Sequence, residues 1–184
     1  NRLNLNSEAV EVTRKGIQEL GYNLEELKKE EMEPGLGNGG LGRLASAFLD
    51  SLSSLNLPGH GYGLRYKYGL FEQRIENGYQ IELLDSWLNR EFVWEIRRPD
   101  ETVKVKFFGE VDVDKREKGK LKFSQKNCQE VNAVPYDVPI IGYRNNTVNT
   151  MRLWSAEPVS ENGPKDFESN RYKHLNQARS VESI

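Results

Sequence analysis

Five glycines within eight positions constrain this chain more than any other feature, because a strongly helical pattern follows them at once. They are Gly35, Gly37, Gly39, Gly40 and Gly42. Glycine has no Cβ, so its backbone can take positive φ and its amide can approach a bound group closely. A helix N-terminus adds unpaired N–H groups and a partial positive charge, which favour an anion such as phosphate. The segment therefore predicts an anion site, although a glycine-rich helix start without any ligand has the same pattern.

The helix behind this segment is predicted for residues 41 to 55. Apolar residues recur there at intervals of three and four, at Leu41, Leu44, Ala45, Phe48, Leu49, Leu52 and Leu55. This spacing places them on one face, so we expect Leu44, Phe48 and Leu52 to be buried. Asn56, Pro58 and Gly59 mark the end of the helix.

Two nucleotide-binding motifs are matched only in part. Residues 37–42 fit the spacing G-x-G-x-x-G, but that fingerprint requires a preceding strand, and residues 24–31 are charged and helical in pattern. It also expects an acidic residue about 20 positions further on, at the end of a second strand, and none stands there. Gly35 and Gly40 have the spacing of a P-loop, but Leu41 and Gly42 stand where lysine and serine or threonine are needed. Both nucleotide interpretations are therefore weak.

The rest of the chain alternates between helical and period-two patterns. Helices are predicted for residues 8–20, where Gly21 follows, and after Asn23, where Glu26 completes a capping-box-like start. Residues 71–75 and 79–83 flank Glu76-Asn77-Gly78, a strong hairpin signal. A second strand pair is expected from residues 93–96 and 103–113, residues 121–123 and 131–134 continue the sheet, and residues 172–184 begin another helix.

Composition excludes several classes of function. The net charge of -2 gives no support for nucleic-acid binding, and no apolar run reaches the length of a membrane span. One cysteine, Cys128, cannot form an intrachain disulfide and offers no metal cluster. The chain lacks a G-x-S-x-G motif and a Cys–His pairing that would indicate a hydrolase.

Four ordered blocks closely resemble the N-terminal region of the α-glucan (glycogen, starch or maltodextrin) phosphorylases. The blocks are Gly35-Leu-Gly-Asn-Gly-Gly-Leu-Gly-Arg-Leu-Ala with Phe48-Leu-Asp-Ser-Leu52, Gly61-Tyr-Gly-Leu-Arg-Tyr-Lys-Tyr-Gly-Leu-Phe71, Pro135-Tyr-Asp-Val-Pro139 and Asn145-Asn-Thr-Val-Asn-Thr-Met-Arg-Leu-Trp154. The resemblance runs along the whole chain and looks more like bacterial members around Pro58 and Trp94. Departures such as Glu33-Pro34 and Ser46-Ala47 are mild.

The resemblance implies an α/β fold, as part of the N-terminal Rossmann-like domain of a two-domain (GT-B type) glycosyltransferase with antiparallel β-hairpin insertions. Residues 1–184 are then a partial N-terminal domain, truncated at both ends, with no second domain present. The chain is polar, with a mean hydropathy of -0.73, so we expect faces meant for the missing parts to be exposed. A nucleotide- or dinucleotide-binding protein using GNGGLG and a non-catalytic carbohydrate-binding module remain the alternatives.

The resemblance also implies an activity, in which the terminal α-1,4-glucosidic bond is cleaved with inorganic phosphate to give glucose 1-phosphate. The family carries pyridoxal phosphate, as a Schiff base with a lysine of the C-terminal domain that lies outside this chain. Gly39 and Gly40 match the positions whose amides approach the substrate and cofactor phosphates, and the backbone of Leu41 the position beside the glucosyl unit.

The remaining residues of the segment are expected to shape the loop: Gly35, Gly37, Asn38, Gly42 and Arg43. No catalytic acid, base or nucleophile and no metal ligand is nominated. The expected partners are an α-1,4-glucan, phosphate and the C-terminal domain, in a cytoplasmic enzyme that is typically a homodimer. The chain alone is expected to be inactive.

Overall fold

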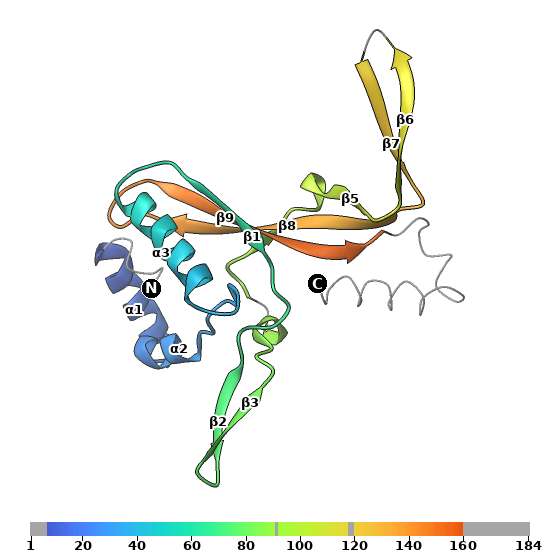
Figure 1. Ribbon diagram of the computed structural model, residues 1–184. Helices are drawn as coiled ribbons and strands as arrows, with labels where there is room; N and C mark the ends of the chain where they lie inside the picture. Colours follow the sequence, from blue (N-terminus) through green and yellow to red (C-terminus); the bar gives the residue numbers. More distant parts are fainter. Residues whose placement is uncertain (1–6, 91, 118–119, 160–184) are drawn as a thin grey trace. The chain divides into compact units, whose positions relative to one another are not determined.

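The computed structural model describes residues 7–90, 92–117 and 120–159, and Figure 1 shows their mixed α/β elements. The helices are α1 (Ser7–Glu19), α2 (Leu24–Glu30) and α3 (Gly40–Ser54), with 3-10 turns at Trp87–Arg90 and Pro99–Glu101. The strands are β1 (His60–Leu64), β2 (Glu72–Glu76), β3 (Tyr79–Leu83), β4 (Ile96–Arg97), β5 (Val103–Phe107), β6 (Glu110–Glu117), β7 (Lys120–Lys126), β8 (Gln129–Ile141) and β9 (Val148–Pro158). Among the described residues, those in 7–97 with 136–154 form one compact unit, and those in 98–135 with 155–159 form another.

Helix α1 ends, and helix α2 begins, where the sequence indicates. Gly21, at φ 83°, follows α1, and the N–H of Tyr22 donates to the carbonyl of Ile17, which is the left-handed helix ending that glycine favours. The side chain of Asn23 then caps α2, because its Oδ1 accepts a hydrogen bond of 2.8 Å from the N–H of Glu25.

In the first unit, the sheet combines parallel and antiparallel neighbours. β1 pairs in parallel with β9, from His60 opposite Thr150 to Leu64 opposite Trp154. β8 is the next strand, and the arrows of β8 and β9 point in opposite directions in Figure 1. The order is β1-β9-β8-β4, so β1 lies at one edge of the sheet.

The β2–β3 pair of the same unit is an antiparallel hairpin. Its turn residues Asn77 and Gly78 have φ values of 52° and 82°. Positive φ at both central positions is typical of the hairpin turn whose twist matches that of the strands. The Asn-Gly pair therefore explains the position of the turn.

In the second unit, β5 pairs antiparallel with the first half of β8, and β6 pairs with β7 in a separate two-stranded sheet. The expectation that residues 93–96 pair with residues 103–113 is wrong. β4 and β5 each pair with β8 instead. The turn signal at Arg98, Pro99 and Asp100 forms a 3-10 turn rather than a hairpin, so it changes the direction of the chain without pairing its flanks.

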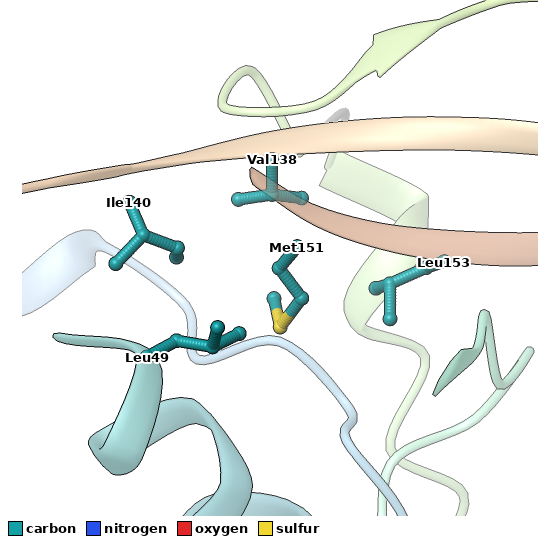
Figure 2. Packing of buried hydrophobic residues seen from close by; sticks show 5 residues of the cluster. All are labelled: Leu49, Val138, Ile140, Met151 and Leu153. Atoms are coloured by element: carbon teal, nitrogen blue, oxygen red, sulfur yellow. The ribbon is translucent and has the colours of Figure 1, made fainter. Parts of the chain in front are cut away.

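The core of the first unit is small and lies between α3 and the sheet. Leu49 of α3 packs with Val138 and Ile140 of β8 and with Met151 and Leu153 of β9, and Figure 2 shows these side chains converging. Leu36, Leu52 and Phe92 pack against this cluster. Burial of this kind stabilises the folded state by about 1.5–3 kcal/mol for each fully buried aliphatic side chain.

The predicted helix and its position after the glycines are confirmed, but the predicted burial is only partly right. Leu52 is half-buried, whereas Leu44 and Phe48 are 49% and 60% exposed. The helix contacts the sheet through Leu49 and Ser53 instead, and the Ser53 hydroxyl donates to the carbonyl of Ile140 at 2.9 Å. The apolar arc of α3 is therefore wider than the surface that the sheet covers.

Two further expectations concern a C-terminal helix and membrane-spanning segments. The helix predicted for residues 172–184 lies outside the described residues. Within the described part of the chain, no helix is long and apolar enough to cross a membrane.

Candidate functional site

The glycine segment is held in place by close backbone packing at both ends. Gly35 is buried, and a Cβ there would come within 2.6 Å of the indole nitrogen of Trp87 and 3.0 Å of Gly69 Cα. A Cβ at Gly42 would overlap the carbonyl oxygen of Leu36. These two positions require glycine for space, and they fix where the middle of the segment lies.

The middle of the segment is open. Asn38, Gly39, Gly40 and Leu41 are exposed, and a Cβ at Gly39 or Gly40 would meet no atom within 4 Å among the described residues. Gly39 is the N-cap residue of α3, and no side chain caps the helix there. The N-cap residue therefore supplies no acceptor for the first-turn N–H groups of α3, which have no partner within the helix itself.

Positive φ is confined to one glycine of the segment. Gly37 has φ 132° and lies beside the ring of Tyr66, so an L side chain would be strained there. Gly40 is not among the residues with positive φ, because it already belongs to the helix. Glycine at position 40 is therefore not required by its backbone conformation, and its importance would lie in the open space around its Cα.

Arg43 pairs with Glu33 across the segment. Its Nη1 and Nη2 donate hydrogen bonds of 3.0 and 3.2 Å to the two carboxylate oxygens. Both side chains are exposed, at 61% and 76%, so the pair contributes at most about 1 kcal/mol. The contact links the first turn of α3 to the residues before the glycines.

A cavity of about 710 Å³ lies on another side of α3. Arg43 and Asp50 line it from the helix, Glu33 from the segment before the glycines, and Trp94 and Tyr143 from elsewhere in the same unit. Gly39, Gly40 and Leu41 do not line this cavity. The open amides and the cavity are therefore separate surfaces.

Other candidate chemistry is sparse. In the part of the chain that the structure describes, no group of three or more His, Cys, Asp and Glu side chains could hold a metal ion. Cys128 is a half-buried free thiol whose Sγ lies 3.9 Å from the carbonyl of Gln125. His60 is exposed at the start of β1.

Two asparagines that sequence reasoning passed over hold the far end of α3. Asn145 donates to the last carbonyls of the helix, those of Ser53 and Ser54, at 2.9 and 3.2 Å. Asn149, 3% exposed, accepts from the N–H of Gly59 and donates to the carbonyl of Leu57, both at 3.0 Å. Both asparagines belong to the block 145–154, but their spacing alone gives no signal for this role.

Two arginine–carboxylate pairs are also missed by sequence patterns. Arg65 forms two hydrogen bonds with Glu95, at 2.6 and 2.9 Å, and its guanidinium lies 3.9 Å from the ring centroid of Tyr136. Arg152 forms the same kind of bidentate pair with Asp137, and both of its hydrogen bonds are 2.7 Å long. Their side chains are 10–19% exposed. Arginine suits such sites because its planar fork matches a carboxylate.

The nucleotide-binding alternative is not favoured by the geometry around the glycines. Helix α2 and residues 31–36, which carry no strand, precede Gly37, where the G-x-G-x-x-G match begins. A dinucleotide fingerprint needs a strand in that place.

Comparison with known proteins supplies the family. The family described as carbohydrate phosphorylase matches residues 17–184. A glycogen phosphorylase of Bacillus subtilis (strain 168) is 56% identical over 150 residues, 82% of this chain and 19% of that protein. One from Chlamydia pneumoniae is 43% identical over 180 residues, 98% of this chain and 21% of that protein. The liver form of Bos taurus is 47% identical over 156 residues, 85% of this chain and 18% of that protein.

The chain therefore spans about a fifth of the length of these curated relatives. The match extends over nearly all of the sequence and includes the glycine segment, α3 and the whole sheet. The chain belongs to the carbohydrate phosphorylase family.

Proposed function

We propose that the full-length protein to which this chain belongs is an α-glucan phosphorylase. It cleaves the terminal α-1,4-glucosidic bond with inorganic phosphate and releases glucose 1-phosphate. The observation that carries this proposal is the pair of open amides at Gly39 and Gly40, in a chain whose relatives are named glycogen phosphorylases. An accessible helix N-terminus favours phosphate through its N–H groups and its dipole.

We further propose that residues 1–184 are part of an N-terminal Rossmann-like domain in a two-domain, GT-B type enzyme. The parallel pairing of β1 with β9, with α3 packed on the sheet, supports this assignment. The β2–β3 and β6–β7 hairpins are then insertions into that domain. The chain contributes one side of the phosphate and glucosyl subsite, and the C-terminal domain contributes the other.

Each residue of the segment has a proposed role. The amides of Gly39 and Gly40 bind phosphate, and the backbone of Leu41 lies beside the glucosyl unit. Gly35 and Gly42 are suited to shaping the loop because their backbones pack closely, Gly37 because of its positive φ, and Arg43 through Glu33. Asn38 completes this set, since its side chain is exposed next to the amides.

The residues present fit one end of pyridoxal phosphate. The open amides of Gly39 and Gly40 suit its phosphate group, which supplies the acid–base chemistry of the reaction when the cofactor is bound. The Schiff base needs a lysine that sheds its proton readily in a desolvated site. Every lysine whose burial is described is exposed or half-buried, so the lysine is assigned to the C-terminal domain. The enzyme is proposed to be a cytoplasmic homodimer acting on an α-1,4-glucan.

The test is Gly40→Val in the full-length enzyme that carries this segment. A valine side chain fills the open space through which phosphate reaches the amides, so turnover with phosphate and maltodextrin falls. Loss of one such transition-state hydrogen bond costs about 10²–10³ in rate. Gly16→Val is the matched control, because Gly16 lies inside a helix and a Cβ there also meets nothing within 4 Å. Wild-type turnover in a folded Gly40→Val enzyme refutes the assignment of the loop, and a wild-type enzyme without phosphorolysis refutes the proposed activity.

A further inference from the structure

Trp87 is a buried aromatic residue of the first unit that has no part in the proposed function so far. It lies in the 3-10 turn Trp87–Arg90 and is 1% exposed, which makes it the largest fully buried side chain among the described residues. The cluster of buried residues around Leu49, which joins α3 to the sheet, does not include it. The ring is therefore buried against other parts of the unit.

The indole nitrogen of Trp87 meets two stretches of backbone at once. It donates a hydrogen bond of 3.1 Å to the carbonyl of Tyr66. It would also lie 2.6 Å from a Cβ at Gly35, and the neighbouring Cδ1 would lie 3.0 Å from it, so this edge of the ring rests on the Gly35 backbone. A buried indole N–H normally has a hydrogen-bond partner, and here that partner fixes the edge that meets Gly35.

Tyr66 extends this contact to the next glycine. Its ring lies 3.8 Å from where a Cβ at Gly37 would be, and Gly37 has the positive φ of the segment. Phe92 packs edge-on against Trp87, with 5.3 Å between the ring centroids, and such a contact restrains the indole. Trp87 and Tyr66 together therefore hold the segment at Gly35 and at Gly37.

The open amides lie between points that this contact controls. Gly42 packs on the carbonyl oxygen of Leu36, and Leu36 directly follows Gly35 in the chain. A displacement of Gly35 would consequently move Leu36 and, through it, the first turn of α3. Gly39 and Gly40 lie between these two contacts, so their amides would move as well.

We propose that Trp87 is a positioning residue for phosphate. By joining Gly35 to the carbonyl of Tyr66, it holds the amides of Gly39 and Gly40 in the geometry that binds the anion. This inference rests on the proposed function, in which those two amides bind phosphate. Trp87 does not touch phosphate itself, since it is buried whereas both glycines are exposed. A misplacement of about 1 Å at a reacting site can cost about 100-fold in rate.

The first measurement is steady-state kinetics of Trp87→Phe in the full-length enzyme that carries this chain. Trp94→Phe is the matched control, because Trp94 belongs to the same unit and lines the cavity that Gly39 and Gly40 do not line. In Trp87→Phe the KM for phosphate rises, and kcat/KM for phosphate falls by about 10–100-fold.

The KM for maltodextrin, which the two amides do not bind, changes less in Trp87→Phe, and Trp94→Phe leaves the KM for phosphate unchanged. A purely structural role would lower the amount of active enzyme and therefore kcat alone. An unchanged KM for phosphate in Trp87→Phe, or an equal rise in both KM values, overturns the proposal.

The second measurement needs no turnover. In the wild-type enzyme, inorganic phosphate slows hydrogen exchange of the amides of Gly39 and Gly40. The phosphate concentration that gives half of this protection rises by about tenfold or more in Trp87→Phe and stays the same in Trp94→Phe. An unchanged concentration in Trp87→Phe overturns the positioning role.

A second variant covers the case in which Trp87→Phe does not fold. Incorporation of 3-benzothienylalanine at position 87 keeps the size and shape of the bicyclic ring. Its larger sulfur replaces the N–H that donates to Tyr66 and rests on Gly35, so the same rise in phosphate concentration is expected. Wild-type protection by phosphate with no change in this variant overturns the role of Trp87 alone. Absence of protection in the wild-type enzyme overturns the phosphate site of the proposed function, and the role of Trp87 with it.

Discussion

Gly40 and Gly42 lie two residues apart in the first turn of α3, yet an added methyl group meets different surroundings at each. At Gly42 it overlaps the carbonyl oxygen of Leu36, a backbone atom that cannot turn away, whereas at Gly40 it meets nothing within 4 Å. The same substitution therefore tests close packing at one position and open space at the other.

We expect Gly42→Ala to lower the free energy of unfolding by about 1–3 kcal/mol, the usual cost of overpacking. Gly40→Ala leaves the free energy of unfolding equal or raises it by up to about 1 kcal/mol, because alanine restricts the unfolded chain. Urea denaturation of the two variants measures the difference. Equal stability of the two variants would contradict the packing described for Gly42.

The carboxylate of Glu130 on β8 has two lysine neighbours on β5. Its oxygens lie 2.9 Å from Lys104 Nζ and 3.6 Å from Lys106 Nζ. The hydrogen bond from Lys104, helped by the charges of both lysines, lowers the pKa of Glu130 below its ordinary value of 4.5. Because the folded state holds this proton less tightly than the unfolded state, the pair stabilises the fold above pH 4.5, and this contribution is lost as the pH falls through the lower folded pKa.

A ¹³C NMR titration of the glutamate side chains checks this direction. We expect the pKa of Glu130 to lie below 4.5 and to rise in Lys104→Gln, which removes the main hydrogen bond. Lys29→Gln on α2 is the control, since that lysine belongs to the other compact unit. An unchanged pKa of Glu130 in Lys104→Gln would contradict the stated cause.

At the scale of elements, the junction between α3 and β1 depends on one buried amide. Asn149 of β9 accepts from the N–H of Gly59 and donates to the carbonyl of Leu57. Asn149→Ala leaves both backbone groups without this partner, so we expect a loss of about 1–3 kcal/mol in the free energy of unfolding.

Asn146→Ala is the matched control for this element, since Asn146 is exposed in the turn before β9. Its effect should stay within about 0.5 kcal/mol, as for other surface substitutions. Thermal or urea unfolding of the two variants gives the comparison. A smaller loss in Asn149→Ala than in Asn146→Ala would show that the amide does not join β9 to the end of the helix.

Elements with local signals could be predicted from the sequence, and those defined by distant partners could not. The start of α3 and the β2–β3 turn depend on glycine and asparagine within a few residues of the element. The pairing of β4 and β5 with β8 brings together residues about 20 to 40 positions apart, and no local period encodes that choice. A register or partner is selected by which faces can be buried together.

The same distinction applies to the candidate site. The sequence distinguishes Gly35 and Gly42, which pack closely, only as members of a dense cluster of glycines. Their contacts with Trp87 and Leu36 required the fold. The helical period predicts burial of Leu44 and Phe48 because it shows an apolar face, but it does not show how much of that face one sheet covers.

At the scale of the whole molecule, apolar residues remain exposed along every part of the described chain. Examples, each between 49% and 84% exposed, are Leu41, Leu44, Phe48 and Leu55 of α3, Tyr62 and Leu64 of β1, and Val111 and Phe123 of the β6–β7 hairpin. Scattered exposure is ordinary, but a contiguous apolar surface marks an interaction site. The small core and the coverage of about a fifth of the relatives' length agree with the proposal that the chain is part of a longer phosphorylase.

The last prediction concerns the 184-residue chain by itself. We expect it to show no phosphorylase activity and to retain no pyridoxal phosphate. The open amides of Gly39 and Gly40 provide only a part of an anion site, and the lysines with described burial are exposed or half-buried. Water stabilises the ammonium form of an exposed lysine, and the amine must lose a proton before it forms a Schiff base, so such a lysine is a poor partner for a stably bound cofactor.

The measurement is cofactor absorbance and glucose 1-phosphate formation after incubation with pyridoxal phosphate, phosphate and maltodextrin. The full-length enzyme that carries this segment is the positive control, and a sample without protein gives the background. Stoichiometric absorbance that survives dialysis, or product above the background, would mean that the chain holds a complete site. The lysine responsible would then have to lie among these 184 residues, and the division of the site between two domains would be wrong.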